Sequence, residues 1–470
     1  MRYRILTFII GMACLSAHAQ VKPQLVTTTE NNNWVSSNAI AISKSGTAAI
    51  TINPDDTLQT INGFGACFNE LGWTSLKTLS SQNRSNIFKE LFKPGAGANF
   101  TICRMPVGAN DFSRDWYSYD ETDGDFEMQH FSIANDKQTL IPFIKSAQQY
   151  NPRLQLWASP WSPPQWMKVN HHYAAAMYPA GSAQNNGLKP EQAGHEGTNM
   201  FIQQDNYFKA YAKYFSLFIE GYQKEGINIA MVMPQNEFNS AQVFPSCTWT
   251  AAGLARFISY LGPQMQKQNV KVFFGTMERA DAKLADTIVT SPLSKDYVKG
   301  IGFQWAGKGA IVTIHQQYPN LTLYQSEQEC GDGKNDWAYC KYTWELMKHY
   351  LSNGASAYMY WNLSLSKDGL SRWGWRQNSL VTVDTVNHAY QYNHEYYLLK
   401  HLSHFVQPGA KMLKTTGNLL AFKNPDNSVV IVVQNEAASP KIITFKAAGK
   451  YITATLPADS FGTITYKSHK

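Results

Sequence analysis

The chain has 470 residues, of which 44% are hydrophobic, so it can form one large domain and a smaller one. The formal net charge of +7 comes from scattered Lys and Arg residues without a basic run, and a nucleic acid is therefore not an expected partner. Aromatic residues make up 13% of the chain, which fits either a large core or surfaces on which sugar rings stack.

Residues 1–19 have the pattern of a secretory signal peptide. Arg2 and Arg4 precede a short apolar run, and Ala17-His-Ala19 is a small-x-small cleavage site. The run is too short to span a bilayer comfortably, and no other segment is apolar enough to do so. A lipid anchor at Cys14 is disfavoured, because the residues before it make a poor lipobox. We expect a monomer that is secreted, periplasmic or attached to the cell surface, with a net charge reduced from +7 to +5 once Arg2 and Arg4 are removed.

Both ends of the mature chain have the short alternating pattern of β-strands. Residues 20–60 contain runs such as Ala39-Ile-Ala-Ile-Ser, and residues 408–470 alternate strands with turns such as Pro425-Asp-Asn-Ser. We predict a small β-sandwich formed by the C-terminal tail together with the N-terminal strands. Because both ends share it, a structural appendage is favoured over a separate sugar-binding module.

Residues 61–407 alternate apolar strands with amphipathic helices, which predicts the α/β class. Continuous apolar strands indicate a parallel sheet covered by helices, and eight such units fit a (β/α)8 TIM barrel. Two helical segments are predicted at Phe208–Glu220 and Trp337–Asn353. The eight predicted strands are Ile61–Phe68, Phe100–Val107, Leu154–Trp161, Ile229–Glu237, Val270–Glu278, Val298–Trp305, Leu321–Glu327 and Ala355–Leu363.

The segment Lys168–Met200, after the third predicted strand, is a long loop on the predicted active face. Long ordered loops are often functional, and the alternative is a tolerated surface insertion.

Five cysteines remain after the signal peptide, with no spacing typical of a zinc site. Cys67 and Cys103 lie in strand-like runs and are expected to be small buried hydrophobic residues. Cys330 and Cys340 bracket a short loop, a spacing compatible with a disulfide in an oxidising compartment. The odd count leaves at least one thiol unpaired within the chain.

The most informative feature is a pair of glutamates, each at the polar end of an apolar run. Glu237 ends Ile229–Glu237 and Glu327 ends Leu321–Glu327. Their separation corresponds to three strand–helix units of about 30 residues each, which places them on strands four and seven of a barrel, at one mouth. Two carboxylates facing each other across a cleft are what glycoside hydrolysis requires.

The surroundings of the two glutamates suggest different roles. An apolar setting would raise the pKa of Glu237 and suit a general acid, while Asn236 beside it can donate to a sugar hydroxyl. Glu327, as a nucleophile, must stay ionised, and Arg104 in the second strand is the natural partner, since an arginine in an apolar run needs one. The alternatives are a Glu237 that only pairs with an arginine and a purely structural Arg104 ion pair.

Other side chains compete for a place at the mouth. Trp161 and Trp361, at the ends of strands three and eight, could form walls for a sugar ring or pack the barrel. The histidines show no ligand spacing, and no metal or cofactor is expected. Further carboxylates that could line the mouth are Glu70, Asp111, Glu278 and Glu329.

The motifs, taken together, resemble glycoside hydrolase family 30, which contains glucosylceramidases and endo-β-1,6-glucanases. The matching landmarks run in order across almost the whole mature chain: Gly63-Phe-Gly-Ala-Cys-Phe, Arg104-Met-Pro with Asp111-Phe-Ser, Ala158-Ser-Pro-Trp-Ser-Pro, Asn236-Glu237, Ser326-Glu327, Trp361-Asn-Leu and Asn427-Ser-Val-Val-Ile-Val-Val.

The resemblance implies a retaining mechanism with Glu237 as acid/base and Glu327 as nucleophile. It also implies that five residues contact the substrate or position the nucleophile: Arg104, Asp111, Trp161, Asn236 and Trp361. One stretch departs from the family, because glucosylceramidases have a His-Trp-Tyr-like sequence where this chain has Gln304-Trp305-Ala306. Trp305 stays a candidate for substrate binding at this altered rim.

The sequence therefore predicts a secreted retaining β-glycosidase acting on β-glucosidic bonds, with β-1,6-linked glucan favoured over glucosylceramide. The alternatives are a glucosylceramidase, an exo-acting β-glucosidase, β-xylosidase or β-fucosidase, an inverting hydrolase on the same barrel, and a non-catalytic carbohydrate-binding barrel. The last would require the loss of a catalytic carboxylate, and both are present.

Overall fold

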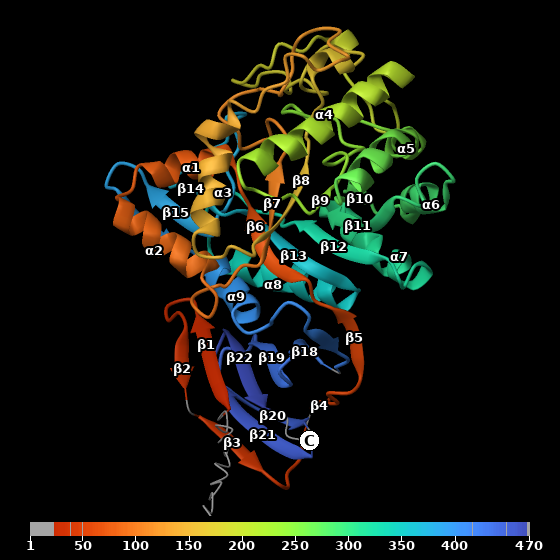
Figure 1. Cartoon of the computed structure of the whole chain (residues 1–470). Helices are drawn as coiled ribbons and strands as arrows, with labels where there is room; N and C mark the ends of the chain where they lie inside the picture. The colour runs from red at the N-terminus through yellow and green to blue at the C-terminus, as the bar shows by residue number, and fades with distance from the viewer. Residues whose placement is uncertain (1–22, 38, 49, 416, 448, 468–470) are drawn as a thin grey trace, which may run out of the picture.

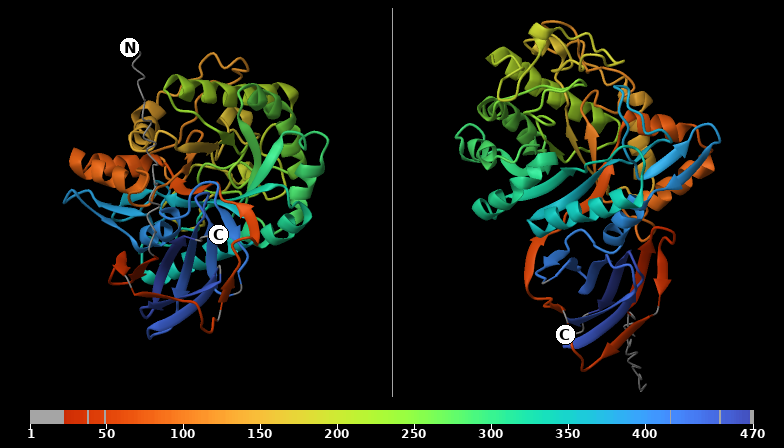
Figure 2. Two further views of the ribbon diagram at one scale, coloured as in Figure 1. Left: turned by 60° about the horizontal axis from the view of Figure 1, so that its bottom comes forward. Right: turned by 180° about the vertical axis from the view of Figure 1, so that it is seen from behind.

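The computed structural model describes residues 23–37, 39–48, 50–415, 417–447 and 449–467 (Figure 1). The expected signal peptide, residues 1–19, and Cys14 lie outside the described residues. The described chain forms an α/β barrel and a β-sandwich that lies below it in Figure 1, as the two further views in Figure 2 also show.

Eight parallel strands close into a barrel, as predicted. The order of hydrogen-bonded neighbours is β10-β11-β12-β13-β6-β7-β8-β9. Each strand lies within its predicted segment or within one residue of it. The strands are β6 (Gly63–Cys67), β7 (Ile102–Pro106), β8 (Gln155–Ser159), β9 (Met231–Val232), β10 (Lys271–Met277), β11 (Val298–Gln304), β12 (Thr322–Glu327) and β13 (Ala355–Asn362).

Helices connect successive barrel strands and cover the outside of the barrel (Figures 1 and 2). The two predicted helical segments fall within α4 and within one residue of α8, respectively. The helices are α1 (Glu70–Lys77), α2 (Ser81–Phe92), α3 (Leu140–Gln148), α4 (Asp205–Lys224), α5 (Ala251–Lys267), α6 (Ala282–Thr290), α7 (Ile311–Gln317), α8 (Trp337–Ser352) and α9 (His394–Ser403).

The fourth barrel strand is much shorter than its predicted segment, Ile229–Glu237. Only Met231–Val232 form strand β9. Pro234 has no backbone N–H to donate to a ladder, and the chain leaves the strand there. Glu237 itself has a left-handed φ of 43° and lies in a turn, so the prediction that it ends a strand is wrong.

Apolar side chains fill the barrel interior below the mouth. A buried cluster there includes Trp157, Met233, Phe273 and Met359, contributed by different strands or by the residues directly after them. Strands β6 and β7 approach closely at Gly65, where an added Cβ would lie 1.7 Å from the carbonyl oxygen of Ile102. The Gly-Phe-Gly motif is therefore explained by this close backbone contact.

The β-sandwich combines both ends of the chain, as predicted. Its larger sheet has the order β2-β1-β22-β19-β18-β17-β5, and its smaller sheet the order β3-β21-β20-β4. The edge strands of both sheets, β2, β5, β3 and β4, come from the N-terminal segment. The strands of the C-terminal tail therefore lie in the middle of each sheet. The strands are β1 (Gln24–Thr29), β2 (Val35–Ser37), β3 (Ile40–Ser43), β4 (Ile50–Ile52), β5 (Thr57–Thr60), β17 (Lys411–Leu413), β18 (Leu419–Lys423), β19 (Ser428–Asn435), β20 (Lys441–Ala447), β21 (Lys450–Leu456) and β22 (Ser460–Lys467).

A third small sheet was not anticipated from the sequence. It is formed by β14 (Ser364–Ser366), β15 (Val381–Asp384) and β16 (Ala389–Tyr392), which follow the last barrel strand. The sheet lies beside α1, where the Ser364 hydroxyl donates to the carbonyl oxygen of Gly72 at 3.2 Å.

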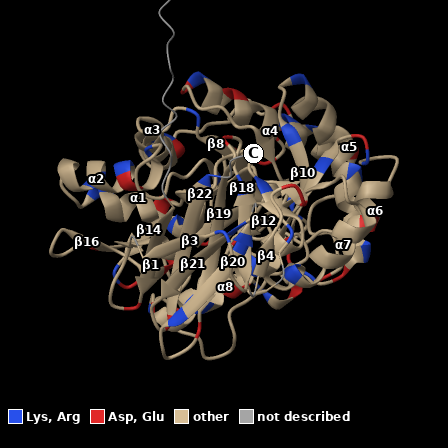
Figure 3. Cartoon of the chain, turned by 90° about the horizontal axis from the view of Figure 1, so that it is seen from below, with Lys and Arg blue, Asp and Glu red and all other residues tan. Residues whose placement is uncertain are grey.

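The described surface has mixed charge. Seen from below, Lys and Arg are spread over many elements with Asp and Glu between them (Figure 3). In the described part of the chain, no helix combines the length and the apolar character that crossing a bilayer requires.

One hydrophobic cluster extends from the barrel and its helices to the side of the sandwich that faces them, which predicts that the two parts unfold together. Phe461 of β22 is fully buried, and its ring lies 5.2 Å from Trp337 and 5.9 Å from Trp344 of α8. Phe461→Ala should lower the free energy of unfolding by about 3–5 kcal/mol, through the lost burial and the cavity it leaves. Urea unfolding followed by tryptophan fluorescence measures this change.

Ile442→Ala, in the same sandwich, provides the matched control. Ile442 is 70% exposed, so its truncation should change the free energy of unfolding by no more than about 0.5 kcal/mol. A second, separate transition in the Phe461→Ala protein, with the barrel retaining its wild-type midpoint, would show that the two parts are not coupled.

Candidate functional site

The barrel brings the predicted site residues to one mouth, at the C-terminal ends of the strands. Glu327 is the last residue of β12, and Trp305 directly follows β11. Arg104 lies within β7 and Trp361 within β13. Asp111, Trp161, Asn236 and Glu237 lie in the loops that follow β7, β8 and β9.

A fully buried arginine holds Glu327 in place. The Arg104 guanidinium donates to Oε2 of Glu327 at 2.6 Å and to the carbonyl oxygen of Ser326 at 3.3 Å. It also donates to the Ser159 hydroxyl and to Oδ1 of Asn236, at 2.9 and 2.7 Å. This charged side chain is thus satisfied without solvent, which a buried arginine requires.

Three tryptophan rings surround the same guanidinium. Its central carbon lies 4.9 Å from the ring centroid of Trp157, 4.4 Å from that of Trp161 and 5.2 Å from that of Trp361. The rings of Trp161 and Trp361 stack at 5.3 Å. These contacts place Trp361 behind the nucleophile candidate, against Arg104, and combine cation–π attraction with the exclusion of water.

Glu237 is presented by a tight turn rather than by a strand. Its backbone N–H donates to the Thr276 hydroxyl at 2.8 Å, and its carbonyl oxygen accepts from the N–H of Ser240 at 2.9 Å. A left-handed φ is unfavourable for a residue with a Cβ, by about 1–2 kcal/mol, so these bonds are needed to hold it.

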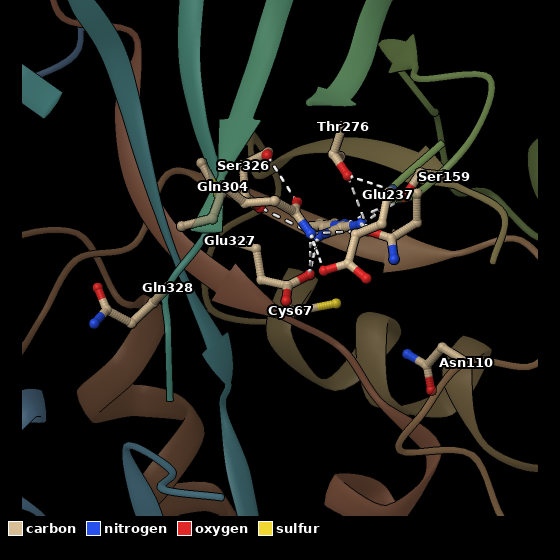
Figure 4. A network of polar contacts seen from close by, with 12 residues as sticks. Cys67, Asn110, Ser159, Glu237, Thr276, Gln304, Ser326, Glu327 and Gln328 are labelled. Carbon is tan, nitrogen blue, oxygen red and sulfur yellow. Dashed lines mark hydrogen bonds and ion pairs between the residues drawn. The ribbon is translucent and has the colours of Figure 1, made fainter. Parts of the chain in front are cut away.

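A single amide nitrogen bridges the two glutamates. Nε2 of Gln304 lies 3.3 Å from Oε1 of Glu237 and 3.2 Å from Oε2 of Glu327 (Figure 4). These two oxygens are therefore no farther apart than the sum of the two contacts, about 6.5 Å. The Ser326 hydroxyl orients the bridging amide by donating to Oε1 of Gln304 at 2.9 Å.

The two carboxyls differ in how readily they bind a proton. Burial raises the pKa of Glu237 well above its usual value, and the nearby charges of Glu327 and Glu278 raise it further. Burial also raises the pKa of Glu327, but there the Arg104 guanidinium opposes the rise by charge and by hydrogen bonding. Arg104 therefore favours the ionised form of Glu327, whereas no cation does the same for Glu237 among the causes of its pKa rise.

The mouth contains a cavity of about 570 Å³. Six of the eight predicted site residues line it, and Arg104 and Trp361 lie outside its lining. Burial and the charge of Glu327 raise the pKa of Asp111 well above its usual value, and its Oδ1 has no hydrogen-bond partner among the described residues. The lining residues are Asp111, Trp161, Asn236, Glu237, Ser240, Gln242, Phe244, Glu278, Arg279, Trp305, Ala306, Glu327, Gly331, Trp375, Arg376 and Gln377.

Two of the competing carboxylates lie elsewhere. Glu70 is buried and accepts from Arg114 at 3.0 Å, away from the cavity lining. Glu329 accepts from Lys308 at 2.6 Å and from the Tyr342 hydroxyl at 2.7 Å. Both are held by structural partners, whereas Asp111 and Glu278 do line the cavity.

The long loop Lys168–Met200 contributes no residue to the cavity lining. It braces the wall from outside, since Glu196 accepts from Nε of Arg279 at 3.0 Å and from the side chain of Asn239 at 3.2 Å. The buried Lys168 ammonium ties the loop to the segment after Glu237 by donating to the carbonyl oxygen of Ser246 at 2.6 Å.

The disulfide that the spacing of Cys330 and Cys340 would permit is not formed. Cys330 and Cys340 are both free and buried, as are the other cysteines in the described part of the chain. The Cys330 thiol donates to the carbonyl oxygen of Gln328 at 3.2 Å, in the chain segment after the nucleophile candidate. Cys67 and Cys103 are buried in strands, as expected.

Several residues that organise the site were missed or undervalued in the sequence. Ser159, Thr276 and Ser326 bind Arg104, Glu237 and Gln304 through their hydroxyls, and Gln304 was noted only as a departure from a family pattern. All four lie at strand ends, and that position was the only available signal. A short polar side chain at a strand end does not reveal which neighbour it contacts.

Within the described residues, no group of three or more His, Cys, Asp or Glu side chains is arranged to hold a metal ion.

Two family models match the chain, one over the barrel and one over the C-terminal part of the sandwich. Residues 61–406 match the glycosyl hydrolase family 30 TIM-barrel domain, and residues 409–464 match the family's β-sandwich domain.

Related proteins include two enzyme types. Putative glucosylceramidase 1 of Caenorhabditis elegans is 30% identical over 424 residues, which cover 84% of this chain and 77% of that protein. Endo-1,6-β-D-glucanase neg1 of Aspergillus fumigatus is 26% identical, with 86% of this chain and 84% of that protein covered. A solved endo-β1,6-glucanase is 25% identical with a TM-score of 0.81, and the match covers 95% of this chain and 99% of that one. The chain belongs to glycoside hydrolase family 30 and is a glycosidase built on that family's barrel and sandwich.

Proposed function

We propose that this chain is a retaining β-glycosidase that cleaves β-1,6-linked glucan, with Glu327 as nucleophile and Glu237 as acid/base. The observation that carries the proposal is the bridging amide of Gln304, which limits the separation of the two carboxylate oxygens to about 6.5 Å. Retaining enzymes have carboxyls about 5–5.5 Å apart, whereas inverting enzymes need about 6.5–9.5 Å to admit a water molecule.

The two steps follow from the two protonation states. In the first, the Glu327 carboxylate attacks the anomeric carbon while Glu237 protonates the departing glycosidic oxygen, which breaks the glycosidic bond and leaves a glycosyl ester on Glu327. In the second, Glu237 removes a proton from water, and that water displaces the sugar from Glu327. Both glutamates return to their starting states, and the configuration at the anomeric carbon is kept.

The substrate preference rests on the rim of the cavity and on the relatives. The cavity lining includes Arg279, Arg376, Gln242 and Gln377, together with the rings of Trp375 and Phe244. Polar groups and rings of this kind suit the hydroxyls and apolar face of a further sugar unit better than a lipid chain. The endo-1,6-β-glucanase relatives support the same choice, while the glucosylceramidase relative makes glucosylceramide the competing substrate.

A substrate panel with product analysis tests the substrate and the stereochemistry together. On β-1,6-glucan, β-1,3-glucan, xylan, glucosylceramide and aryl β-glycosides, we expect the highest kcat/KM for β-1,6-glucan. Proton NMR should detect the β-anomer of the product first. An α-anomer appearing first would exclude retention, and a preference for glucosylceramide would replace the glucan proposal.

Variants of the two glutamates test their separate roles. Glu327→Gln should reduce turnover to background on every substrate, because no nucleophile remains. Glu237→Ala should lower kcat/KM, which reports the first step, by about 10²–10⁴-fold on glycosides with poor leaving groups and much less on those with good leaving groups, since only the former need protonation in that step. Azide should rescue Glu237→Ala as a glycosyl azide of retained configuration. Equal losses on both substrate types would contradict the acid/base role.

Arg104→Met tests whether the buried arginine keeps the nucleophile ionised. Without the guanidinium, the effect of burial on Glu327 is opposed only by hydrogen bonds such as that of Gln304, so the pKa of Glu327 rises and the acidic limb of the kcat/KM profile moves to higher pH. Loss of one partner of a buried pair should also cost about 3–5 kcal/mol of stability near neutral pH. Initial rates on an aryl β-glucoside between acid and neutral pH measure the shift, and circular dichroism checks the fold.

Arg114→Met is the matched control for Arg104→Met. Arg114 also pairs with a glutamate, Glu70, but its side chain is 38% exposed and the pair lies away from the cavity. This substitution should leave the acidic limb in place. An unmoved limb in Arg104→Met would exclude the proposed control of Glu327 by Arg104.

Export and a monomeric state complete the proposal. Their support is the signal-peptide pattern of residues 1–19 and the absence of any sequence feature that calls for a partner chain. Intact-mass analysis of the protein from its native source should give a chain that starts at residue 20. Light scattering should give the mass of one chain.

A further inference from the structure

A third carboxyl, that of Glu278, lies beside the proposed acid/base. Glu278 directly follows strand β10, is 1% exposed and lines the same cavity as Glu237 and Glu327. The retaining mechanism needs only two carboxyls, so this buried charged group at the mouth has no role in the two steps described above.

One oxygen of Glu278 fastens the turn that carries Glu237. Oε1 accepts the backbone N–H of Asn239 and the hydroxyl of Ser240, both at 2.9 Å. Ser240 in turn donates its backbone N–H to the carbonyl oxygen of Glu237. Thr276 binds the backbone N–H of Glu237 itself, and Glu278 binds the two residues at the end of the turn, Asn239 and Ser240. The strained backbone of Glu237 is therefore held by hydrogen bonds at both ends of the turn.

The other oxygen of Glu278 is buried and has no hydrogen-bond partner among the described residues. Among the described residues, the only cation paired with the Glu278 carboxyl is Arg279, whose guanidinium lies 3.8 Å from Oε1. The same guanidinium also pairs with Glu196, which is half-exposed. Burial raises the pKa of Glu278 to about 7, although the Ser240 hydroxyl and Arg279 oppose the rise. The group therefore changes its charge near neutrality.

The charged form of Glu278 acts on Glu237. Glu278, Glu327 and Asp111 are the acidic groups that raise the pKa of Glu237, and the Gln304 amide lowers it. As the pH rises and Glu278 ionises, its negative charge opposes the ionisation of Glu237. The general acid then stays protonated to a higher pH than it would beside a neutral side chain.

We propose that Glu278 is a positioning residue that holds the turn bearing Glu237 and, through its negative charge, extends the range in which Glu237 remains a proton donor. The proposal rests on the acid/base role proposed for Glu237. It assigns Glu278 no contact with the reacting atoms; its action passes through the geometry and protonation of Glu237.

Two substitutions separate the two effects of Glu278. Glu278→Gln keeps an oxygen that accepts from Asn239 and Ser240 but removes the charge. We expect the basic limb of its kcat/KM profile on a poor-leaving-group glycoside to move to lower pH, with the maximal kcat within about threefold of wild type. Glu278→Ala removes the acceptor as well, so kcat/KM on that substrate should fall by about 10²-fold, because a loosened turn misplaces the acid. An aryl glycoside with a good leaving group should lose much less.

Glu196→Gln is the matched control. Glu196 contacts Arg279 and Asn239, the same neighbours, but its side chain is 55% exposed, so water screens its charge. This variant should leave both the basic limb and the leaving-group dependence unchanged. Thermal unfolding of all three variants checks that the fold is retained.

The results separate this inference from the proposed function. If Glu237→Ala shows the leaving-group dependence, but Glu278→Gln keeps the wild-type basic limb and Glu278→Ala slows both substrates equally, Glu278 is only a structural residue and the inference is overturned. If Glu237→Ala lacks that dependence, the acid/base assignment itself fails. A shifted limb in Glu278→Gln with a leaving-group effect in Glu278→Ala supports the positioning role.

Discussion

The site depends on the buried ion pair between Arg104 and Glu327. A guanidinium inside a barrel would be costly without partners. Here it has the Glu327 carboxylate, oxygen acceptors from β8, β12 and the loop after β9, and three tryptophan rings. The same contacts that satisfy Arg104 fix the position of Glu327. Stability and function are therefore linked at this point, because a change that frees the arginine also releases the nucleophile candidate.

The two glutamates differ in pKa because their surroundings are unequal. Both are buried and share the Gln304 amide, but the guanidinium contacts only Glu327. This asymmetry raises the pKa of Glu237 relative to that of Glu327, and the charge of the buried Glu278 raises the pKa of Glu237 further. Two chemically identical side chains thus differ in their affinity for a proton because a cation acts on Glu327 and an anion acts on Glu237.

The scaffold supports this arrangement through connections between distant parts of the chain. The N-terminal strands form the edges of both sandwich sheets, and β22 packs on α8, which follows the strand that ends in Glu327. The long loop after β8 braces the cavity wall from outside through Glu196. The long loop thus holds Arg279, a residue of the cavity lining, although the loop itself does not line the cavity.

The sequence by itself determined the barrel, the sandwich and the two glutamates, because periodic apolar runs and strand-end polar residues depend on local order along the chain. Only the tertiary structure decided which side chains meet. In the structure Glu237 lies in a strained turn instead of a strand, Arg104 and Trp361 lie outside the cavity lining, and Cys330 and Cys340 are unpaired. The structure also showed that Gln304 bridges the two glutamates and that Glu278, one of several candidates for the mouth, binds the turn after Glu237. The physical reason is that hydrogen bonds and charge effects depend on distances of a few ångströms between residues far apart in sequence, and no local pattern encodes those distances.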